Sequence, residues 1–416
     1  MKFLNTLAII VKDIKIGWNL GNTLDANCLE FLDYSLDQTA SETCLLNPRA
    51  TQEFFDKLSG FGFNIFRIPT TWTGHFGDGP DYKIDESWMK RVHEVVQYAI
   101  NTGSYAILNV HHEEWNYAFS DNLESAKVIL EALWKQIAAE FEEFDEHLIF
   151  EGMNEPRKVN TDVEWNGGDE EGWNFVNEMN ELFMKTIRTS GGNNEIRHLM
   201  IPTYAAALNE HTLEAFKYPN DDDKVILDKD IPVIIGEFGA MSRNNEDDRN
   251  KWATTFVGST KELGVPCILW ENGVFEGDGE LFGIIDRTEL TVTFLKYLKG
   301  LMAGIGNTLD IPDVTLTIEI PTVEPPTVEP PTTETPTIEP PMVEPSTVEP
   351  PTVEPSIVQP PTVQSPTVQP PTTETPAVQP PTKSEECYKQ VSECWGSNQN
   401  KDEYSKLNEI CSKIWN

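Results

Sequence analysis

The 416-residue chain is poor in basic side chains and contains no long apolar run. Lysine and arginine number 31 against 68 aspartate and glutamate residues, which gives a formal net charge of -37 and a sequence pI of about 4.4. Nucleic acids and anionic membrane surfaces repel such a protein, so neither is expected as a partner. No stretch is long and apolar enough to span a bilayer. A neutral polymer is indifferent to this charge.

Cysteine is also scarce, with six residues and no Cys-x-x-Cys or Cys/His spacing of the kind that binds zinc. Cys28 and Cys44 lie in one polar loop and are candidates for a disulfide. Cys267 lies in an apolar strand and is predicted to be a packed free thiol. The three remaining cysteines lie near the C-terminus and are Cys387, Cys394 and Cys411. In a secreted protein we expect two of these three to form a disulfide.

A glycine-rich phosphate loop after the first strand is missing, which argues against an open, doubly wound sheet. Apolar strand candidates instead alternate with helix-period stretches at roughly forty-residue spacing, the pattern of a parallel sheet covered by helices. We therefore predict an α/β fold of the (β/α)8 TIM-barrel type. The strand candidates are 16–20, 63–68, 105–110, 147–151, 197–202, 232–236 and 266–270, and the clearest helices are 51–58, 87–100, 125–141 and 173–189.

Composition divides the chain into four segments. Residues 1–11 resemble part of a secretion signal without its cleavage site, and 12–305 form the predicted barrel. Residues 311–382 repeat a Pro-Thr-Val-Glu-Pro pattern and are expected to be an extended linker that reaches on the order of 200 Å. Residues 383–416 form a small predicted module in which 402–415 have helical apolar spacing. Its aromatic residues either bind sugar, dock a scaffold protein or fill a small core.

Two glutamates each follow a run of β-forming residues: Glu155 comes after 148–154, and Glu237 after 232–236. In a parallel barrel such positions lie at the C-terminal rim, where catalytic residues are found. A single glutamate there is usually a solvated loop residue. Two carboxylates that different strands bring to one rim are what the cleavage of a glycosidic bond requires.

Further motifs follow the same strands in order. They are Gly17–Ala26, Phe66–Trp72, Asn109–Trp115, Asn154–Pro156, Gly236–Gly239 and Trp270–Gly273. Together they resemble glycoside hydrolase family 5, and most of all its subfamily 4 endoglucanases and xyloglucanases from cellulolytic anaerobic microbes. The resemblance covers residues 12 to about 300. It implies a β-glucan substrate and neither a metal nor a cofactor.

The resemblance also assigns roles. Glu155 is expected to be the general acid/base, with a raised pKa, and Glu237 the nucleophile. In a retaining enzyme their carboxyl groups lie about 5 to 5.5 Å apart. Arg67 is expected to hold the nucleophile ionised, and Asn154 to bind the sugar 2-hydroxyl. The remaining expected substrate-binding residues are Asn22, Trp72, His111, His112, Trp115 and Trp270.

One part of the family pattern is missing. The strand candidates number seven, and no His-x-Tyr pair follows the fifth, where the family places a sixth strand and helix. Val225–Leu227 could be a remnant of strand six, but only four residues separate it from the next strand, too few for a parallel crossover. The barrel is therefore expected either to open here or to be crossed by a loop over residues 224–231. We expect this gap and the abrupt N-terminus to be deletions.

These observations favour a secreted, monomeric endo-β-1,4-glucanase. A xyloglucanase, xylanase or mannanase of the same family is the near alternative. The other alternative is a catalytically impaired subunit that binds polysaccharide or docks on a scaffold, because the sixth strand is missing.

Overall fold

The structure is a computed structural model that describes residues 10–30, 32–219, 232–277 and 279–309. The predicted linker, the C-terminal module with its cysteines and the possible remnant of strand six lie outside the described residues. Of the segment 1–11, only Ile10 and Val11 are described, and Ile10 is buried. Within the described part of the chain, no helix is both long and apolar enough to cross a membrane.

Strands and helices alternate along the described chain as the sequence pattern predicts. The strands are β1 (Gly17–Asn19), β2 (Ile65–Ile68), β3 (Tyr105–Asn109), β4 (Leu148–Glu151), β5 (Leu199–Met200), β6 (Ile235–Phe238), β7 (Cys267–Leu269), β8 (Ile285–Asp286) and β9 (Thr291–Val292). The α-helices are α2 (Gln52–Phe61), α3 (Glu86–Asn101), α4 (Leu123–Glu140), α5 (Glu170–Arg188), α6 (Glu210–Ala215), α7 (Glu246–Leu263) and α8 (Leu295–Gly304). Short 3-10 helices are η1 (Ala40–Thr43), η2 (Glu114–Asn116), η3 (Ser120–Asn122), η4 (Gly192–Glu195) and η5 (Tyr204–Ala206).

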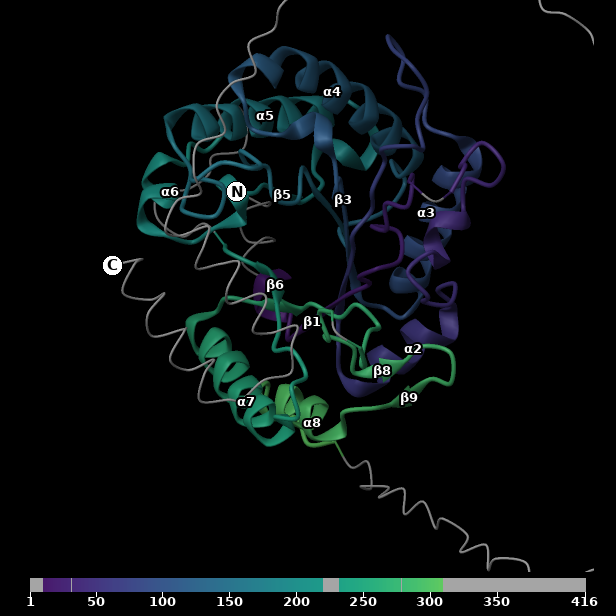
Figure 1. Cartoon of the computed structure of the whole chain (residues 1–416), viewed down its shortest axis with the longest axis vertical. Coiled ribbons are helices and arrows are strands. Elements are labelled where there is room, and N and C mark those ends of the chain that lie inside the picture. The colour runs from purple at the N-terminus through teal and green to yellow at the C-terminus, as the bar shows by residue number, and fades with distance from the viewer. Residues whose placement is uncertain (1–9, 31, 220–231, 278, 310–416) are drawn as a thin grey trace, which may run out of the picture. The chain divides into compact units, whose positions relative to one another are not determined.

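Seven strands form one parallel sheet in the order β5-β4-β3-β2-β1-β7-β6. The sheet curls with its helices outside it, and β8 and β9 form a separate hairpin (Figure 1). Among the described residues β5 and β6 do not pair, so the described sheet is open between them; the loop over 224–231, the other expectation, lies outside the described residues. Both edge strands are largely half-exposed, whereas the residues of β1 to β4 and β7 are all buried.

The two faces of each strand carry different layers, because successive side chains on a strand point to opposite faces. Phe66, Leu108 and Phe150 belong to the large core cluster that includes the helices. The alternate positions form a smaller cluster inside the barrel: Ile10, Ile14, Ile65, Tyr105, Ile107, Ile149 and Ile268. Two residues further along, toward the C-terminal rim, the same inner face carries Arg67, Asn109, Glu151 and Trp270. Strand periodicity therefore places a polar layer directly above an apolar one.

Strand β6 begins three residues later than predicted, so Glu237 lies within it rather than after it. Its pairing with β7 contains an irregularity: Ile235 is opposite Cys267, and Phe238 is opposite Leu269. Three steps on β6 thus match two on β7, as in a β-bulge. Ile235 and Phe238 both pack with the outer core cluster. The extra residue therefore lets Glu237 point inward, toward the polar layer, where regular alternation from Ile235 would turn it outward.

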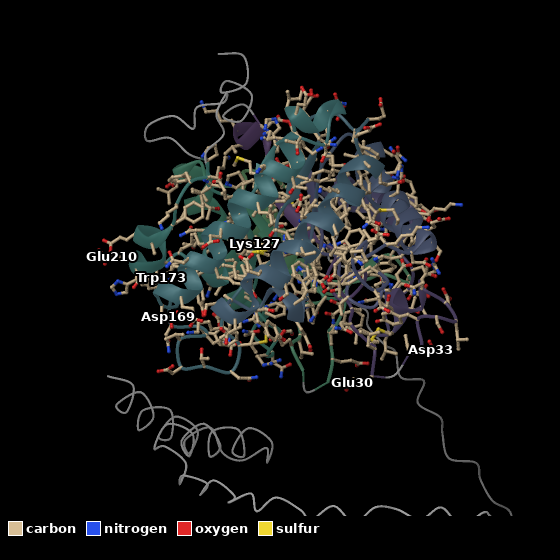
Figure 2. All side chains as sticks on the ribbon, turned by 90° about the horizontal axis from the view of Figure 1, so that it is seen from above. Glu30, Asp33, Lys127, Asp169, Trp173 and Glu210 are labelled. Carbon is tan, nitrogen blue, oxygen red and sulfur yellow. A yellow bond between two sulfur atoms is a disulfide. The ribbon has the colours of Figure 1, made fainter. Side chains whose placement is uncertain are left out.

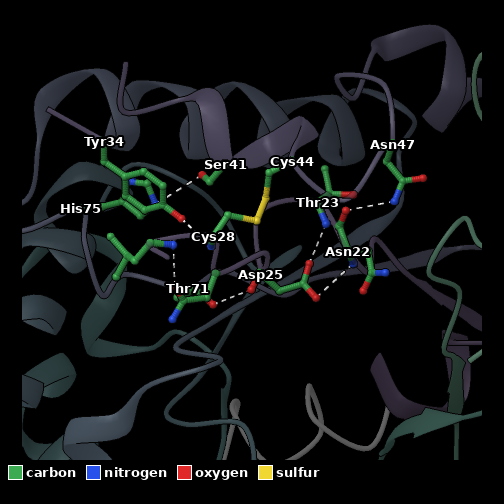
Figure 3. Close-up of a disulfide and its surroundings, with 12 residues drawn as sticks. Asn22, Thr23, Asp25, Cys28, Tyr34, Ser41, Cys44, Asn47, Thr71 and His75 are labelled. Atoms are coloured by element: carbon green, nitrogen blue, oxygen red, sulfur yellow. Dashed lines mark hydrogen bonds between the residues drawn. A yellow bond between two sulfur atoms is a disulfide. The ribbon is translucent and has the colours of Figure 1, made fainter. Parts of the chain in front are cut away.

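The long connection between β1 and α2 is closed by a disulfide between Cys28 and Cys44 (Figure 3). Beside it the Tyr34 hydroxyl accepts a hydrogen bond from the Cys28 amide at 2.8 Å, and the Tyr34 ring stacks on His75. This loop begins with the rim residues 22–25. Cys267, the other cysteine in the described residues, is a buried free thiol as predicted, and burial raises its pKa to about 11.

Replacing both Cys28 and Cys44 by serine is expected to lower the free energy of unfolding by about 3 kcal/mol, because the bond closes a loop with a sequence separation of 16 residues. Urea unfolding of the wild type with and without dithiothreitol measures the effect. The double variant should not respond to the reductant. Equal wild-type midpoints in both buffers would show that the bond contributes nothing.

Candidate active site

The polar layer at the C-terminal rim is organised around Arg67, the third residue of β2. Its side chain is buried, and all five of its N–H groups are accounted for by protein acceptors. Nε and Nη2 donate to the two oxygens of Glu151 at 2.6 and 2.8 Å. The remaining contacts go to Asn19 at 3.0 Å, Asn154 at 2.7 Å and Glu237 at 2.5 Å. The two carboxylates raise the pKa of Arg67 further above its ordinary value, against the opposing effect of burial.

The contact between Arg67 and Glu237 is the one expected for an arginine that keeps this carboxylate ionised. The expectation that Arg67 also contacts substrate is wrong, because its N–H groups are already used by the protein. The side chain of Glu237 is 30% exposed, so it combines a buried cationic partner with access from the rim.

Glu155 follows β4 at the same rim. Its pKa is raised to about 7, first because the group is desolvated and then because of the negative charge of Glu237. Arg157 acts in the opposite direction, with its Nη1 3.8 Å from Glu155 Oε2. The two carboxyl groups are therefore treated differently by their neighbours. Glu237 has a direct guanidinium contact, whereas desolvation and the charge of Glu237 favour the protonated form of Glu155. Such a pair can supply one acid and one nucleophile.

Asn154 is buried beside Glu155, and its backbone amide donates to Val110 at 2.9 Å. Its side-chain oxygen accepts from Arg67, which fixes the amide orientation and leaves the NH2 group as a donor. That orientation suits a contact with a hydroxyl group of a ligand.

His111 and His112 differ in burial although their ring centroids lie only 4.3 Å apart. His111 is buried, and its ring lies parallel to that of half-buried Trp270, with centroids 6.0 Å apart. His112 is exposed. Because Asn109 Oδ1 accepts from the Thr70 amide, its NH2 group donates to His111 Nδ1 at 3.1 Å. Burial lowers the pKa of His111, so the neutral ring carries its proton on Nε2 as a hydrogen-bond donor.

Asp25 lies close to both histidines, and one ligand atom from each of the three residues lies within 4.8 Å of the others. However, its two carboxylate oxygens accept the backbone amides of Asn22 and Thr23 at 3.0 and 2.7 Å (Figure 3). These contacts make the Asp25 side chain the acceptor that closes a turn over residues 22–25. Asn22 itself is half-buried, with a φ of 54° in this turn after β1.

The prediction that Trp72 binds substrate is wrong. Its side chain is fully buried in the core, and its indole nitrogen donates to the Asn109 carbonyl at 3.0 Å. Trp115 is half-buried and donates to Glu113 at 2.6 Å. Glu113 also accepts from the Trp72 amide and from the amide and hydroxyl of Thr73. This buried carboxylate therefore ties together the loops after β2 and β3.

Sequence reasoning missed several residues that build the site: Asn19, Asp25, Asn109, Glu113 and Glu151. Glu151 offered a signal, since a glutamate that ends an apolar strand run is costly to bury unless it is paired. Two hollows of about 410 and 450 Å³ lie elsewhere, one at α4 and α5 and the other around His75. Neither is lined by Glu155 or Glu237, so the site is identified by its side-chain chemistry and not by these hollows.

Comparison with known proteins places this geometry in a family. The model named Cellulase (glycosyl hydrolase family 5) matches residues 24–228 and 224–276. Endoglucanase B of Neocallimastix patriciarum is 56% identical over 367 residues, covering 74% of this chain and 78% of that protein. The 367 aligned positions exceed the number of residues in 74% of this 416-residue chain. The relative therefore carries residues that this chain lacks. The family match likewise divides at residues 224–228, between β5 and β6 in the sequence.

Two solved structures are also similar. One is a GH5-4 broad specificity endoglucanase from Ruminococcus champanellensis with bound cellotriose, 37% identical with a TM-score of 0.67, covering 71% of this chain and 97% of that one. The other is XEG5A, a GH5 xyloglucan-specific endo-β-1,4-glucanase from a metagenomic library in complex with cellotriose. It is 34% identical with a TM-score of 0.67, covering 73% of this chain and 99% of that one.

Replacing Arg67 by methionine is expected to lower the free energy of unfolding by about 3 to 5 kcal/mol, because it leaves Glu151 buried without its cation. Urea unfolding measures the change. Lys83→Met is the matched control, because it breaks the exposed pair with Glu86 and should cost less than about 1 kcal/mol. Similar losses in the two variants would contradict the central role of Arg67. Combining Arg67→Met with Glu151→Gln should recover part of the loss.

Proposed function

This chain belongs to glycosyl hydrolase family 5 and is a glycoside hydrolase of the endoglucanase type, and we propose that it cuts internal β-1,4 linkages of a glucan by a retaining double displacement. The mechanism is supported by the different surroundings of two carboxyl groups at the rim. Glu237 is paired with a buried guanidinium, and Glu155 has a pKa raised to about 7.

In the first step Glu237 attacks the anomeric carbon while Glu155 gives its proton to the departing oxygen, so the glycosidic bond breaks as the glycosyl–Glu237 ester forms. Esterification removes the charge of Glu237, one of the causes that raise the pKa of Glu155. The pKa of Glu155 then falls, and the group acts as the base that takes a proton from water. Water attacks the same carbon, releases Glu237 and restores the starting charges.

The proposed substrate is a β-1,4-glucan chain, since two similar structures hold cellotriose. Asn154 offers a donor to the sugar 2-hydroxyl, His111 offers its Nε2–H, and the half-buried ring of Trp270 offers a stacking surface. Xyloglucan is the nearest alternative substrate, because one of the two similar enzymes is specific for it. We also propose that the protein is secreted, a proposal supported by the Cys28–Cys44 disulfide, because such bonds persist in oxidising compartments.

A catalytically impaired, polysaccharide-binding subunit is the second candidate, and the open edge between β5 and β6 favours it. Strand β6 carries the proposed nucleophile and pairs on one side only among the described residues. An edge strand is held less firmly than a central one, so the position of Glu237 depends more heavily on Arg67.

The decisive comparison is reducing-sugar release from carboxymethyl cellulose by the wild type and by Glu237→Ala. Loss of the nucleophile should reduce the rate by more than about 1,000-fold. Glu262→Ala, which changes an exposed glutamate on α7, is the control and should keep the wild-type rate. Equal rates for the wild type and Glu237→Ala would favour the impaired subunit. Insertion of the missing strand and helix from a relative should then restore hydrolysis.

The pH dependence of kcat/KM tests the role of Glu155. The first step needs its protonated form, so activity should fall tenfold per pH unit above about pH 7, where this carboxyl group ionises. With an aryl cellobioside whose leaving group departs without protonation, Glu155→Ala should retain the first step and lose this alkaline limb. A limb that persists unchanged in the variant would assign the proton donor to another group.

A further inference from the structure

Arg157 lies two residues after the proton donor Glu155, in the connection between β4 and α5. Its Nη1 donates to the backbone carbonyl of Glu155 at 3.1 Å and lies 3.8 Å from Oε2 of the Glu155 carboxyl group. The second distance is too long for a hydrogen bond, but a positive charge at this distance still favours the ionised carboxylate. Arg157 is therefore held beside the acid without donating a hydrogen bond to its carboxyl group.

Glu164 holds the guanidinium in this position. Its Oε1 accepts from Arg157 Nε at 3.0 Å, and its Oε2 accepts from the Asn160 amide at 2.9 Å. Both oxygens of the Glu164 carboxylate thus have a donor, and its side chain is only 17% exposed. The guanidinium also lies over the Trp165 ring, with Cζ 4.2 Å from the ring centroid, which is an attractive contact. Together these contacts oppose any movement of the guanidinium toward Glu155.

The backbone that carries Arg157 is itself fixed to neighbouring elements. The amide of the next residue, Lys158, donates to the Tyr204 hydroxyl at 3.0 Å, and the Lys158 ammonium donates to Asp169 at 2.7 Å. Figure 2 labels Asp169 and Trp173, at the start of α5, on the same side of the molecule. The connection after β4 is therefore tied to α5 and to the segment after β5, so the position of Arg157 is well defined.

Charged groups of several other elements also act on Glu155. Burial and then Glu237 of β6 raise its pKa, Arg157 and Arg67 of β2 lower it, and Glu151 of β4 raises it. Arg67 is hydrogen-bonded to both Glu237 and Glu151, so these three groups form one unit whose position the strands fix. Arg157 is placed by side-chain contacts within a loop. It is therefore the charge near Glu155 whose position depends on a single carboxylate partner.

The titratable groups that lie in the field of Arg157 are His111, His112 and Tyr117. Burial lowers the pKa of both histidines and raises the pKa of the tyrosine, so all three are largely neutral at pH 7. The charge that reaches Glu155 from this side of the site is therefore set by Arg157 and by its partner Glu164.

Hydrolysis requires Glu155 to be protonated in the first step and ionised in the second. A guanidinium in direct contact would favour the ionised form throughout, and its absence would favour the protonated form. We propose that Glu164 is a positioning residue that holds the Arg157 guanidinium beside Glu155 but out of contact with its carboxyl group, and that this placement sets the pH range in which Glu155 delivers its proton. The inference rests on the proposed glycoside hydrolysis and adds to it the groups that adjust its proton donor.

The test follows the alkaline limb of kcat/KM for cellopentaose, whose leaving group is a sugar that needs the proton of Glu155. Arg157→Met removes the cation, so Glu155 stays protonated to higher pH and the limb should move up by about one pH unit. Glu164→Gln should move the limb down by about one pH unit, because the released guanidinium then approaches Glu155. The side chain of glutamine has a single acceptor oxygen and cannot serve both Arg157 and Asn160.

Two further variants serve as controls. Lys127→Met removes one positive charge from a side chain that is 27% exposed, against 26% for Arg157, and that is likewise bound to glutamates, Glu124 and Glu178. Lys127 is labelled in Figure 2, and the limb of this variant should coincide with that of the wild type. Arg157→Lys keeps the charge, so its limb should lie closer to the wild type than to Arg157→Met. The position of a limb does not depend on the fraction of active enzyme, so partial unfolding moves none of them.

The double variant Arg157→Met/Glu164→Gln shows whether Glu164 acts through Arg157. Its limb should coincide with that of Arg157→Met, because no guanidinium remains to be held. A further downward shift in the double variant would show that Glu164 acts by its own charge, and an unmoved limb in either single variant would show that the pair does not adjust Glu155. Each of these results overturns the inference alone. A wild type that does not hydrolyse cellopentaose would overturn the proposed hydrolysis and the inference with it.

Discussion

The site depends on one buried guanidinium. Arg67 brings Glu151, Asn154 and Glu237 together from β4, the loop after it and β6, and it also contacts Asn19 of β1. Buried charges are costly unless every one of them is paired and hydrogen-bonded. Here the fork geometry of arginine satisfies two carboxylates at once, which a lysine ammonium could not do with the same geometry. Glu151 compensates the charge permanently, while Glu237 contributes a carboxylate that remains 30% exposed.

Much of this arrangement follows from strand periodicity, which is why the sequence predicts it. Ile65 and Arg67 share a face of β2, as Ile149 and Glu151 share one of β4, so an apolar layer and a polar layer are built by the same alternation. The position of Glu237 does not follow in this way. It depends on the bulge in β6, and a bulge is defined by the register with β7, which a single strand sequence does not contain.

Trp72 shows a second limit of the sequence. A tryptophan just after a strand suggests a sugar platform, yet the residue fills the core, because its indole N–H finds the Asn109 carbonyl. Trp165, which lies outside the strand motifs, is largely exposed. An aromatic residue packs wherever it can bury its ring and satisfy its N–H group, and both conditions are set by distant segments. Composition therefore gives the number of aromatic residues but not which of them face a ligand.

The open barrel and the catalytic charges are linked through β6. In the described structure this strand pairs only with β7, and Phe238 packs against Trp252 and Phe256 of α7. On the side of the site it is held by the Asn19 side chain, which donates to the Gly236 carbonyl at 2.9 Å, and by the Arg67–Glu237 contact. When Glu237 is esterified, the negative charge that attracts Arg67 disappears. The strand is then held more weakly at the stage when Glu155 must activate water. A complete barrel would support β6 from both sides throughout the cycle. The missing strand should therefore impair the second half of the reaction more than the first.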